Sequence, residues 1–543
     1  MMARLAVLVW VVALGACSMA APAADTVLFN GKVFTANPAQ PWAEALAIRG
    51  ERIIAVGDNA SINAQAGTST RRIDLGGRTV VPGFNDAHVH VAPRPPAYRV
   101  ALPEEPTTGM VEQALQSARH DAPSGQWLDL EIGGRVLDDL SVDRAWLDAR
   151  VSDRPVMLQA FTGHGMILNS AALTLTGVAE SIQDPEGGRF GRDSAGRLNG
   201  RVEEYAEQLV RRRLTSLVPA AQGPAAYLKM SREAVALGIT SVQETGLGDR
   251  QAKVVADLIA ADLPLRWRAM RFPLREGGGD LQDSKPLVPP QPTRKIDARG
   301  MKWILDGTPI DRLAALRAPY ADRPGDNGRM NLSPARLAQI VGWAYGSEDP
   351  LAVHAVGDAA IAAYLSALEA AGSADTWRAK RPRLEHGDLL APDLLPRAKA
   401  LGVVVVQNPA HFMLRAPLAA RLGDERMKTM QPMKSLLAAG IPVAIGSDGP
   451  LSPFLNIMFA ILHPVNPAEA LSREEAVFAY TRGSAYAEFM EKEKGWLVPG
   501  ALADLAVLSA DLFTVPPEQL PSLRSVLTLI GGQSAHDAGV LGR

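Results

Sequence analysis

The sequence has almost no cysteine: Cys17, near the N-terminus, is the single one in 543 residues. It falls in a segment that we expect to act as an export signal. The rest of the chain can therefore form no internal disulfide, no cysteine-based zinc site and no cysteine nucleophile.

Excess charge is also lacking, since the formal net charge is −2 and no strong basic cluster occurs. This argues against a protein that binds nucleic acid or an anionic membrane surface. The short run Arg211–Arg213 lies in an expected helix and is explained by a solvated helix face. A hydrophobic content of 47% and a charged content of 21% are typical of a globular protein with a sizeable core.

Residues 1–24 are predicted to be a signal peptide. Arg4 supplies the positive start, and the apolar stretch Leu5–Ala16 is too short to span a bilayer as a stable helix. Ala21-Pro22-Ala23 fits an ordinary cleavage site, whereas Leu14-Gly15-Ala16-Cys17 resembles a bacterial lipobox in which Cys17 is lipidated. Both alternatives place the protein outside the cytoplasm, in the periplasm or lipid-anchored in a bacterial cell envelope.

A pair of histidines follows the apolar run Thr79–Val81. The segment is Pro82-Gly83-Phe84-Asn85-Asp86-Ala87-His88-Val89-His90. Residues i and i+2 of a strand share one face, so His88 and His90 can direct two imidazoles at one point. That arrangement suits a divalent metal such as zinc.

This segment resembles the first-strand signature of the amidohydrolase superfamily. Gly500-Ala501-Leu502-Ala503-Asp504-Leu505 is similar to its C-terminal signature, and later motifs narrow the resemblance to the amidohydrolase-3 branch, which includes N-substituted formamide deformylase-like proteins. The resemblance runs from about Asp25 to about Gly532. It implies a distorted TIM (β/α)8 barrel with a metal centre.

The two ends of the chain contain short alternating segments with turn residues between them, such as Asn30-Gly31. Neither end has enough strands to bury a core alone. We therefore expect residues 25–80 and 485–543 to pair into one composite β-sandwich domain.

Residues 81–484 alternate between strand-like and helix-like segments, which indicates a parallel α/β architecture. Helices are expected at Pro334–Ala344 and Ala359–Ala371. An insertion at about 92–225 is too long for one βα connection, and within it Asp184–Gly200 is expected to be an exposed loop or flap. The strand candidates are Val80–Asn85, Pro155–Ala160, Ile239–Glu244, Leu265–Arg271, Met301–Asp306, Leu351–His354, Arg383–His386, Val403–Gln407 and Val443–Ser447, of which we assign Pro155–Ala160 to the insertion.

Metal-ligand residue types occur at the ends of five of these strands, where such barrels carry their functional groups. Taken singly, a histidine at a strand end is explained as a structural histidine, and an aspartate there is explained as the cap of the next helix. Their order along the strands, HxH, Lys, His, His, Asp, matches the binuclear pattern of the superfamily. The predicted metal ligands are His88, His90, Lys302, His354, His386 and Asp448.

Lys302 is an unusual residue in an apolar strand, because a buried unpaired charge is costly. The resemblance implies that CO₂ carboxylates its amine and that the carbamate bridges two metals. Glu244 is the rival bridging group, and Lys302 could instead be a snorkelling or ion-paired side chain. Zinc suits these ligands best, and manganese, cobalt, nickel and iron stay open.

Asp448 is expected to ligate a metal and to accept the proton of the attacking water, which it then passes to the leaving nitrogen. Contacts to substrate are less defined. His164 is expected to stabilise the tetrahedral oxyanion or to hold the substrate, and the other candidate substrate-binding residues are Asn169, Gln407 and His411.

The sequence thus predicts a metal-dependent hydrolase of a C–N, amide-like bond in a small molecule. Alternatives are an ester, lactone or cyclic-imide hydrolase and a mononuclear deaminase-type enzyme. Outside enzymes, the alternatives are a metal-free binding or assembly module and a solute-binding lipoprotein. No nucleic-acid partner is expected, and both a lipid anchor and a homo-oligomer are compatible with the sequence.

Overall fold

The computed structural model describes residues 23–91, 93–219, 222–247, 255–256, 258–259, 262–272 and 295–541. The predicted export signal up to residue 22, with Cys17, lies outside these residues. Among the helices described, none is long and apolar enough to cross a bilayer.

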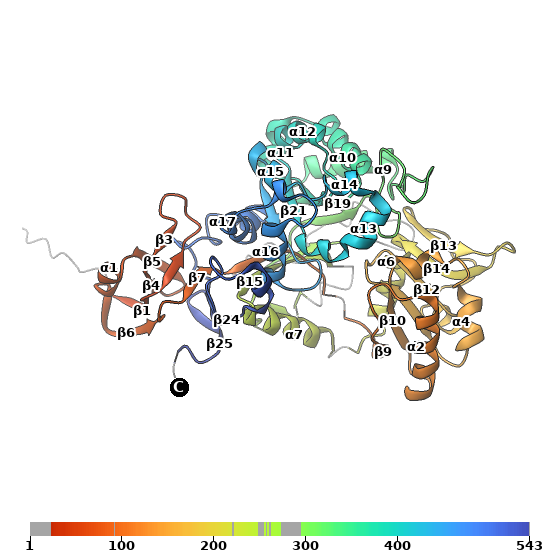
Figure 1. Cartoon of the computed structure of the whole chain (residues 1–543), viewed down its shortest axis with the longest axis horizontal. Coiled ribbons are helices and arrows are strands. Elements are labelled where there is room, and N and C mark those ends of the chain that lie inside the picture. Colours follow the sequence, from red (N-terminus) through yellow and green to blue (C-terminus); the bar gives the residue numbers. More distant parts are fainter. Residues whose placement is uncertain are drawn as a thin grey trace, which may run out of the picture.

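The centre of the molecule is a nearly closed barrel of eight parallel strands (Figure 1). Each strand pairs with the next one along the chain, and the short strand β17 (Ile296–Asp297) pairs with β16. The arrangement confirms the predicted α/β barrel. The eight strands are β8 (Phe84–Val89), β15 (Ile239–Leu247), β16 (Arg266–Arg271), β18 (Met301–Ile304), β19 (Leu351–Ala355), β20 (Arg383–His386), β21 (Val404–Gln407) and β22 (Val443–Ile445).

The first barrel strand starts later than predicted. The segment expected as one strand, Val80–Asn85, is divided between β7 (Thr79–Pro82), which belongs to the sandwich, and β8. Gly83 separates them, and a Cβ there would lie 2.7 Å from Cβ of Thr240. The chain can therefore pass close to β15 at this point only because residue 83 has no side chain.

Helices cover the outer face of the barrel, and each predicted helix is present. In α9 (Pro334–Gly346), Ser333 caps the first turn, and the buried residues Leu337, Ile340, Val341 and Ala344 follow helical spacing. The other barrel helices are α7 (Gln222–Ala236), α10 (Asp358–Ala371), α11 (Ala374–Lys380), α12 (Leu395–Leu401), α13 (Arg415–Leu422), α14 (Asp424–Met427), α15 (Met433–Ala439), α16 (Pro453–Leu462), α17 (Arg473–Phe478) and α18 (Ser484–Ala487).

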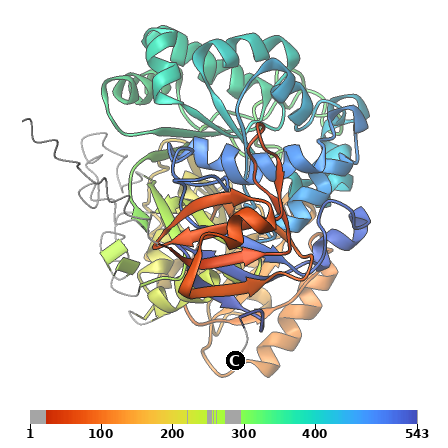
Figure 2. The ribbon, with the colours of Figure 1, turned by 90° about the vertical axis from the view of Figure 1, so that its left-hand side faces the viewer.

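Two further sheets from the chain ends form the sandwich in front of the barrel (Figure 2). Their shared core contains residues from both ends, for example Leu28, Val80, Leu505 and Leu527, which confirms the composite β-sandwich. One sheet has the order β5 (Arg52–Gly57), β4 (Ala45–Arg49), β1 (Ala24–Phe29), β6 (Ala66–Asp74), with α1 (Asn59–Asn63) beside it. The other has the order β25 (Gln533–Asp537), β24 (Ser525–Ile530), β23 (Leu505–Leu508), β7, β2 (Lys32–Phe34), β3 (Trp42–Ala43).

A third sheet lies on the opposite side of the barrel from the sandwich (Figure 1). It contains β11, which includes most of the strand candidate Pro155–Ala160, so this candidate is not a barrel strand, as predicted. The sheet order is β13 (Gly188–Arg192), β14 (Leu198–Glu204), β12 (Gly165–Leu168), β11 (Val156–Ala160), β10 (Leu128–Ile132), β9 (Tyr98–Val100). Its helices are α2 (Thr108–Asp121), α3 (Gly134–Asp138), α4 (Arg144–Arg150), α5 (Ser170–Leu175) and α6 (Tyr205–Thr215).

The segment Asp184–Gly200, expected to be an exposed loop or flap, is mostly exposed or half-buried, but it has regular secondary structure. The segment contains β13 and the start of β14, which pair as an antiparallel hairpin. Its glycines and charged residues concealed a strand pattern, since burial alternates along β14 and Phe190 of β13 is buried.

Candidate metal centre

Five of the six predicted ligands lie at or just after the carboxyl ends of barrel strands, where parallel strands direct their last side chains to one place, whereas Lys302 is the second residue of β18. His88 and His386 belong to β8 and β20, and Asp448 follows β22. Four of the six, His88, Lys302, His354 and His386, are buried. The side chains of His90 and Asp448 are 45% and 26% exposed, so the cluster is open to solvent on their side.

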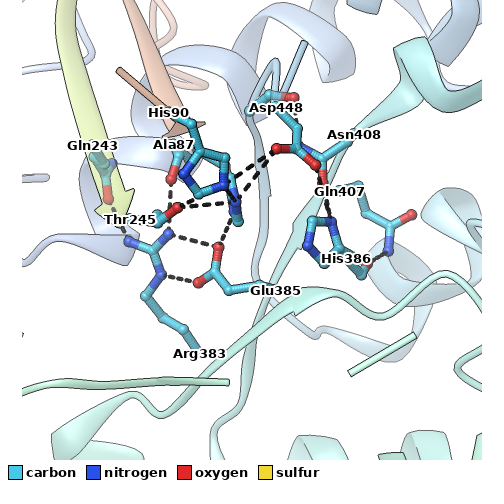
Figure 3. Close-up of polar contacts among 12 residues, drawn as sticks. Ala87, His90, Gln243, Thr245, Arg383, Glu385, His386, Gln407, Asn408 and Asp448 are labelled. Atoms are coloured by element: carbon cyan, nitrogen blue, oxygen red, sulfur yellow. Dashed lines mark hydrogen bonds and ion pairs between the residues drawn. The ribbon is translucent and has the colours of Figure 1, made fainter. Parts of the chain in front are cut away.

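The first group of ligand atoms consists of His88, His90 and Asp448. Figure 3 labels His90 and Asp448, which lie close together. The Nε2 atoms of the two histidines are 3.2 Å apart. Oδ1 of Asp448 lies 3.7 Å from Nε2 of His88 and 3.4 Å from Nε2 of His90. Two imidazoles and a carboxylate at this spacing can bind one divalent cation.

A second group contains His386, His411 and Asp448. Oδ2 of Asp448 lies 3.3 Å from Nε2 of His411 and 3.9 Å from Nδ1 of His386. Asp448 therefore directs one carboxylate oxygen at each group. Burial opposes ionisation of Asp448, but the surrounding histidines outweigh it and hold its pKa well below the usual value, so it is a carboxylate.

His354 and Lys302 complete the inner wall of the site. The His354 ring lies beside that of His386, with centroids 4.4 Å apart, and its Nε2 atom is buried without a hydrogen-bond partner. Among the described residues, none accepts a hydrogen bond or forms an ion pair with Lys302. Burial lowers the pKa of the Lys302 amine.

Two of the candidate ligands also have an unusual backbone conformation. His386 has φ of 66° and Asp448 has φ of 54°, both in the left-handed region that residues other than glycine rarely occupy. Because side chains alternate along a strand, this change at the end of β20 allows His386 and its predecessor Glu385 both to reach the site. Such local strain is concentrated at functional sites in proteins.

Carboxylates and amides behind the histidines orient the rings. Nδ1 of His88 lies 2.6 Å from Oε2 of Glu385, and Nδ1 of His386 lies 2.8 Å from Oδ1 of Asn408. Burial lowers the pKa of His88 to about 4 and that of His386 to about 3, so both rings are neutral. With the proton on Nδ1, Nε2 of each ring keeps its lone pair for a metal.

His411 lies between two carboxylates. Its Nδ1 atom is 3.4 Å from Oδ2 of Asp388, and its Nε2 atom faces Asp448. Burial opposes protonation, but the hydrogen bonds to Asp388 and Asp448 outweigh it and raise the pKa of His411 to about 10. A protonated imidazole is no ligand, so His411 would have to lose a proton to bind a metal.

His164 reaches this centre from the third sheet. Its ring lies beside that of His354, with centroids 5.1 Å apart. Its Nδ1 atom is 3.0 Å from Oε1 of Glu204. Burial opposes protonation, but the Glu204 carboxylate outweighs it and raises the pKa of His164 to about 9.

The other two substrate candidates occupy different positions. Gln407 is buried and donates its amide to the backbone oxygen of His386, so it lies directly beneath a candidate ligand. Asn169 is not in the site: its side chain caps α5, and all four of its hydrogen bonds go to backbone groups of the third sheet and its connections. These bonds occupy the side chain of Asn169, and its expected contact to substrate stays a prediction.

Sequence reasoning did not identify Glu385 or Asp306. Asp306 accepts three backbone N–H groups, from Ala315, Val356 and Gly357, and its Oδ1 lies 4.0 Å from Nε2 of His354. A usable signal for Glu385 was present, since Arg383-Leu384-Glu385-His386 places two charges on the same face of a strand that had to be buried. For Asp306 the signal was weaker, because Asp306-Gly307 also fits an ordinary turn.

Comparison with known proteins agrees with this geometry. Residues 71–536 match the model of the Amidohydrolase family. The chain is 26% identical to N-substituted formamide deformylase of Arthrobacter pascens, over 94% of this chain and 97% of that protein. It is 28% identical to Protein LONG AFTER FAR-RED 3 of Arabidopsis thaliana, over 94% and 92% of the two chains.

Among solved structures, an uncharacterized metal-dependent hydrolase from Pyrococcus horikoshii has the same fold, with a TM-score of 0.72. It is 22% identical, and the match covers 91% of this chain and 99% of that one. The family match covers the barrel, the third sheet and the later strands of the sandwich, from the end of β6 onward, and it includes all the strands that carry the candidate ligands. The chain therefore belongs to the amidohydrolase family.

Proposed function

We propose that the protein is a metal-dependent hydrolase that cleaves a C–N bond of an amide-like small molecule. The observation that carries the proposal is the convergence of His88, His90 and Asp448, from opposite edges of the sheet, within metal-binding distance of one another. Because β8 and β22 are the first and last barrel strands, only the closing of the barrel brings these side chains together.

The donor set fits a divalent cation of the zinc type, which prefers imidazole nitrogen and carboxylate oxygen. Glu385 fixes the tautomer of His88, as carboxylates do behind metal-binding histidines. The unpartnered Nε2 atom of His354 also supports a bound cation, since a buried imidazole nitrogen without a partner is costly.

A cation at this place would act as a Lewis acid and lower the pKa of a water molecule towards ~7. Asp448 supplies the base, because its carboxylate is ionised and partly exposed beside the same cluster. It takes the proton from the attacking water and returns it to the leaving nitrogen, so that the amide bond breaks into an acid and an amine.

His354 and His386 would hold a second metal, and carboxylated Lys302 would supply oxygen ligands to both metals. Burial of Lys302 without a partner supports this proposal, since an uncharged amine is the form that reacts with CO₂. The rival Glu244 is less suited, because its oxygens already accept hydrogen bonds from the backbone of Val91 and Gly246. It lies 3.7 Å from Nδ1 of His90, as an orienting group would.

Metal content tests the proposal directly. We would purify the protein with zinc supplied and compare it with Lys302→Met, which keeps the length and removes the amine. The expected result is about two metals per chain in the wild type and one or none in the variant. About one metal in both proteins would favour the mononuclear alternative, and none in either would overturn the metal-dependent mechanism.

Activity should then be screened on N-substituted formamides first, because the relative from Arthrobacter pascens is named for them. N-acyl amines, esters, lactones and cyclic imides belong in the same panel. Release of formate or another acid together with an amine supports C–N hydrolysis. Turnover of esters or lactones alone would contradict it.

We further propose that the protein is exported, because Arg4 and the apolar stretch Leu5–Ala16 have the features of a signal peptide. Fractionation of cells that express the full chain and a Cys17→Ser variant tests this. Release of only the variant from the membrane fraction would support a lipid anchor, and presence of both in the cytoplasm would contradict export.

A further inference from the structure

Glu204 joins the third sheet to the candidate metal centre. It ends β14, its side chain is buried, and both of its carboxylate oxygens face Nδ1 of His164, at 3.0 and 3.1 Å. His164 precedes β12, which pairs with β14. The two residues thus form a pair at the edge of one sheet, directly above the barrel.

The surroundings of Glu204 are shaped to hold its carboxylate in this place. Oε2 accepts a hydrogen bond of 2.8 Å from Nδ2 of Asn331. Gly307, just after the lysine-bearing strand β18, has no side chain, and a Cβ there would clash with Oε1 of Glu204. The loop after β18 therefore leaves room for a carboxylate that comes from another sheet.

The backbone of Glu204 supports the same conclusion. Its φ of 55° and ψ of −127° are strained for a residue other than glycine. Glycine or asparagine would adopt these φ and ψ angles with less conformational strain. A glutamate in such a conformation is best explained by the function of its side chain.

With Nδ1 directed at Glu204, Nε2 of His164 points to the other side of the ring. No described residue forms a hydrogen bond with Nε2, and the ring itself lies against that of His354. This leaves one polar atom of His164 available at the rim of the centre where a substrate would bind.

We propose that Glu204 is a positioning residue: it holds the His164 ring so that Nε2 contacts the substrate beside the metal centre. The inference rests on the proposed function, since the contact matters only if substrate binds there. His164 then stabilises charge on the carbonyl oxygen, and Glu204 acts on the reaction only through His164. The expected effect of losing an orienting partner is about 10–100-fold.

The test uses the metal-loaded full chain and the variant Glu204→Gln, which removes the charge and keeps the size. The matched control is Glu203→Gln, because Glu203 is adjacent, 35% exposed and paired with Arg329 instead. Three quantities are measured: metal content, kcat and KM on a turned-over substrate, and the ¹⁵N NMR signals of His164, assigned with His164→Gln.

We expect Glu204→Gln to keep its metal, to lose at least about tenfold in kcat/KM, and to shift the ring-nitrogen signals of His164. Glu203→Gln should match the wild type in all three. Glu204→Asp fits the backbone but withdraws the carboxylate from His164 by one methylene. It should give an intermediate loss of kcat/KM, and it replaces Glu204→Gln in the experiment if Glu204→Gln does not fold.

The inference is overturned if the His164 signals are the same in Glu204→Gln and the wild type, or if Glu203→Gln loses as much activity. It is also overturned if Glu204→Gln loses its metal, because that loss would show that Glu204 and His164 stabilise the fold around the metal centre and do not act on the substrate. Failure of the proposed function looks different: the wild type itself would bind no metal or hydrolyse nothing, while the NMR comparison would still report on Glu204 and His164.

Discussion

Nδ1 of His88 lies 2.6 Å from Oε2 of Glu385, and both side chains are completely buried. Arg383 holds Glu385 from the other side through a hydrogen bond of 2.7 Å to Oε1. Burial opposes ionisation of Glu385, but Arg383 and His88 outweigh it and keep its pKa well below the usual value. A candidate metal ligand on β8 is thus fixed by an ion pair on β20, across the barrel.

Glu385→Gln should weaken metal binding by about 10–100-fold, since the uncharged amide no longer raises the basicity of His88. Chelator competition on the purified protein measures this. The matched control is Glu369→Gln on α10, whose exposed carboxylate pairs with Arg397 far from the ligands. Equal metal affinity in both variants would show that Glu385 serves the fold alone.

His411→Asn should leave metal content unchanged and lower kcat, because a protonated imidazole between Asp388 and Asp448 orients the base without binding the metal. Elemental analysis together with steady-state kinetics checks both parts. His120→Asn is the control, as its side chain is 91% exposed. Loss of one metal per chain from His411→Asn would instead make His411 a ligand of the second group.

Local signals in the sequence were sufficient for much of this architecture. The spacing of His88 and His90 defines one face of a strand whatever the strand pairs with. Likewise, Ser333 before a helical apolar pattern predicts α9 without knowledge of its neighbours. The regular alternation of strands and helices indicated a parallel α/β architecture, and the resemblance to the amidohydrolase superfamily implied that it closes into a barrel, in which each strand pairs with the next.

What could not be predicted depends on contacts between distant segments. Glu385 meets His88 across 297 positions of sequence, and Glu204 meets His164 through a strained backbone that no composition indicates. The motif around Asn169 shows the opposite case, because it also fits a helix cap, and the Asn169 side chain caps α5. Local chemistry identified the candidate ligands, whereas their orienting partners required the fold.

Asp138→Asn should loosen the third sheet from the barrel. Asp138 of α3 accepts hydrogen bonds from Arg312 and Arg421, and both arginines also bind Asp322. Hydrogen bonds to charged groups contribute about 1.5–3 kcal/mol each, so we expect faster hydrogen exchange in β9–β14 and unchanged exchange in the barrel strands.

The control for that experiment is Asp193→Asn, since Asp193 pairs with Arg197 within the turn between β13 and β14. It removes the same charge from the same sheet without touching the barrel. Exchange that rises equally in both variants, or not at all in Asp138→Asn, would contradict a role of Asp138 in attaching the sheet.

Gly446→Ala should separate the first and last barrel strands and so remove the metal. Gly446 follows β22, and a Cβ there would lie 2.5 Å from Cβ of His88, far inside contact distance. Overpacking of this kind costs about 1–3 kcal/mol. Because Asp448 donates its N–H to the backbone oxygen of His88 at 2.8 Å, any displacement also moves the two ligands apart.

Gly342→Ala provides the matched control, because Gly342 lies within α9 and no atom beyond the adjoining backbone of that helix lies within 4 Å of the added methyl group. Alanine should stabilise that helix by roughly 0.8–1 kcal/mol. Metal content and thermal unfolding of both variants decide the question. If Gly446→Ala binds metal as the wild type does, the close approach of β8 and β22 is not what brings His88 and Asp448 together.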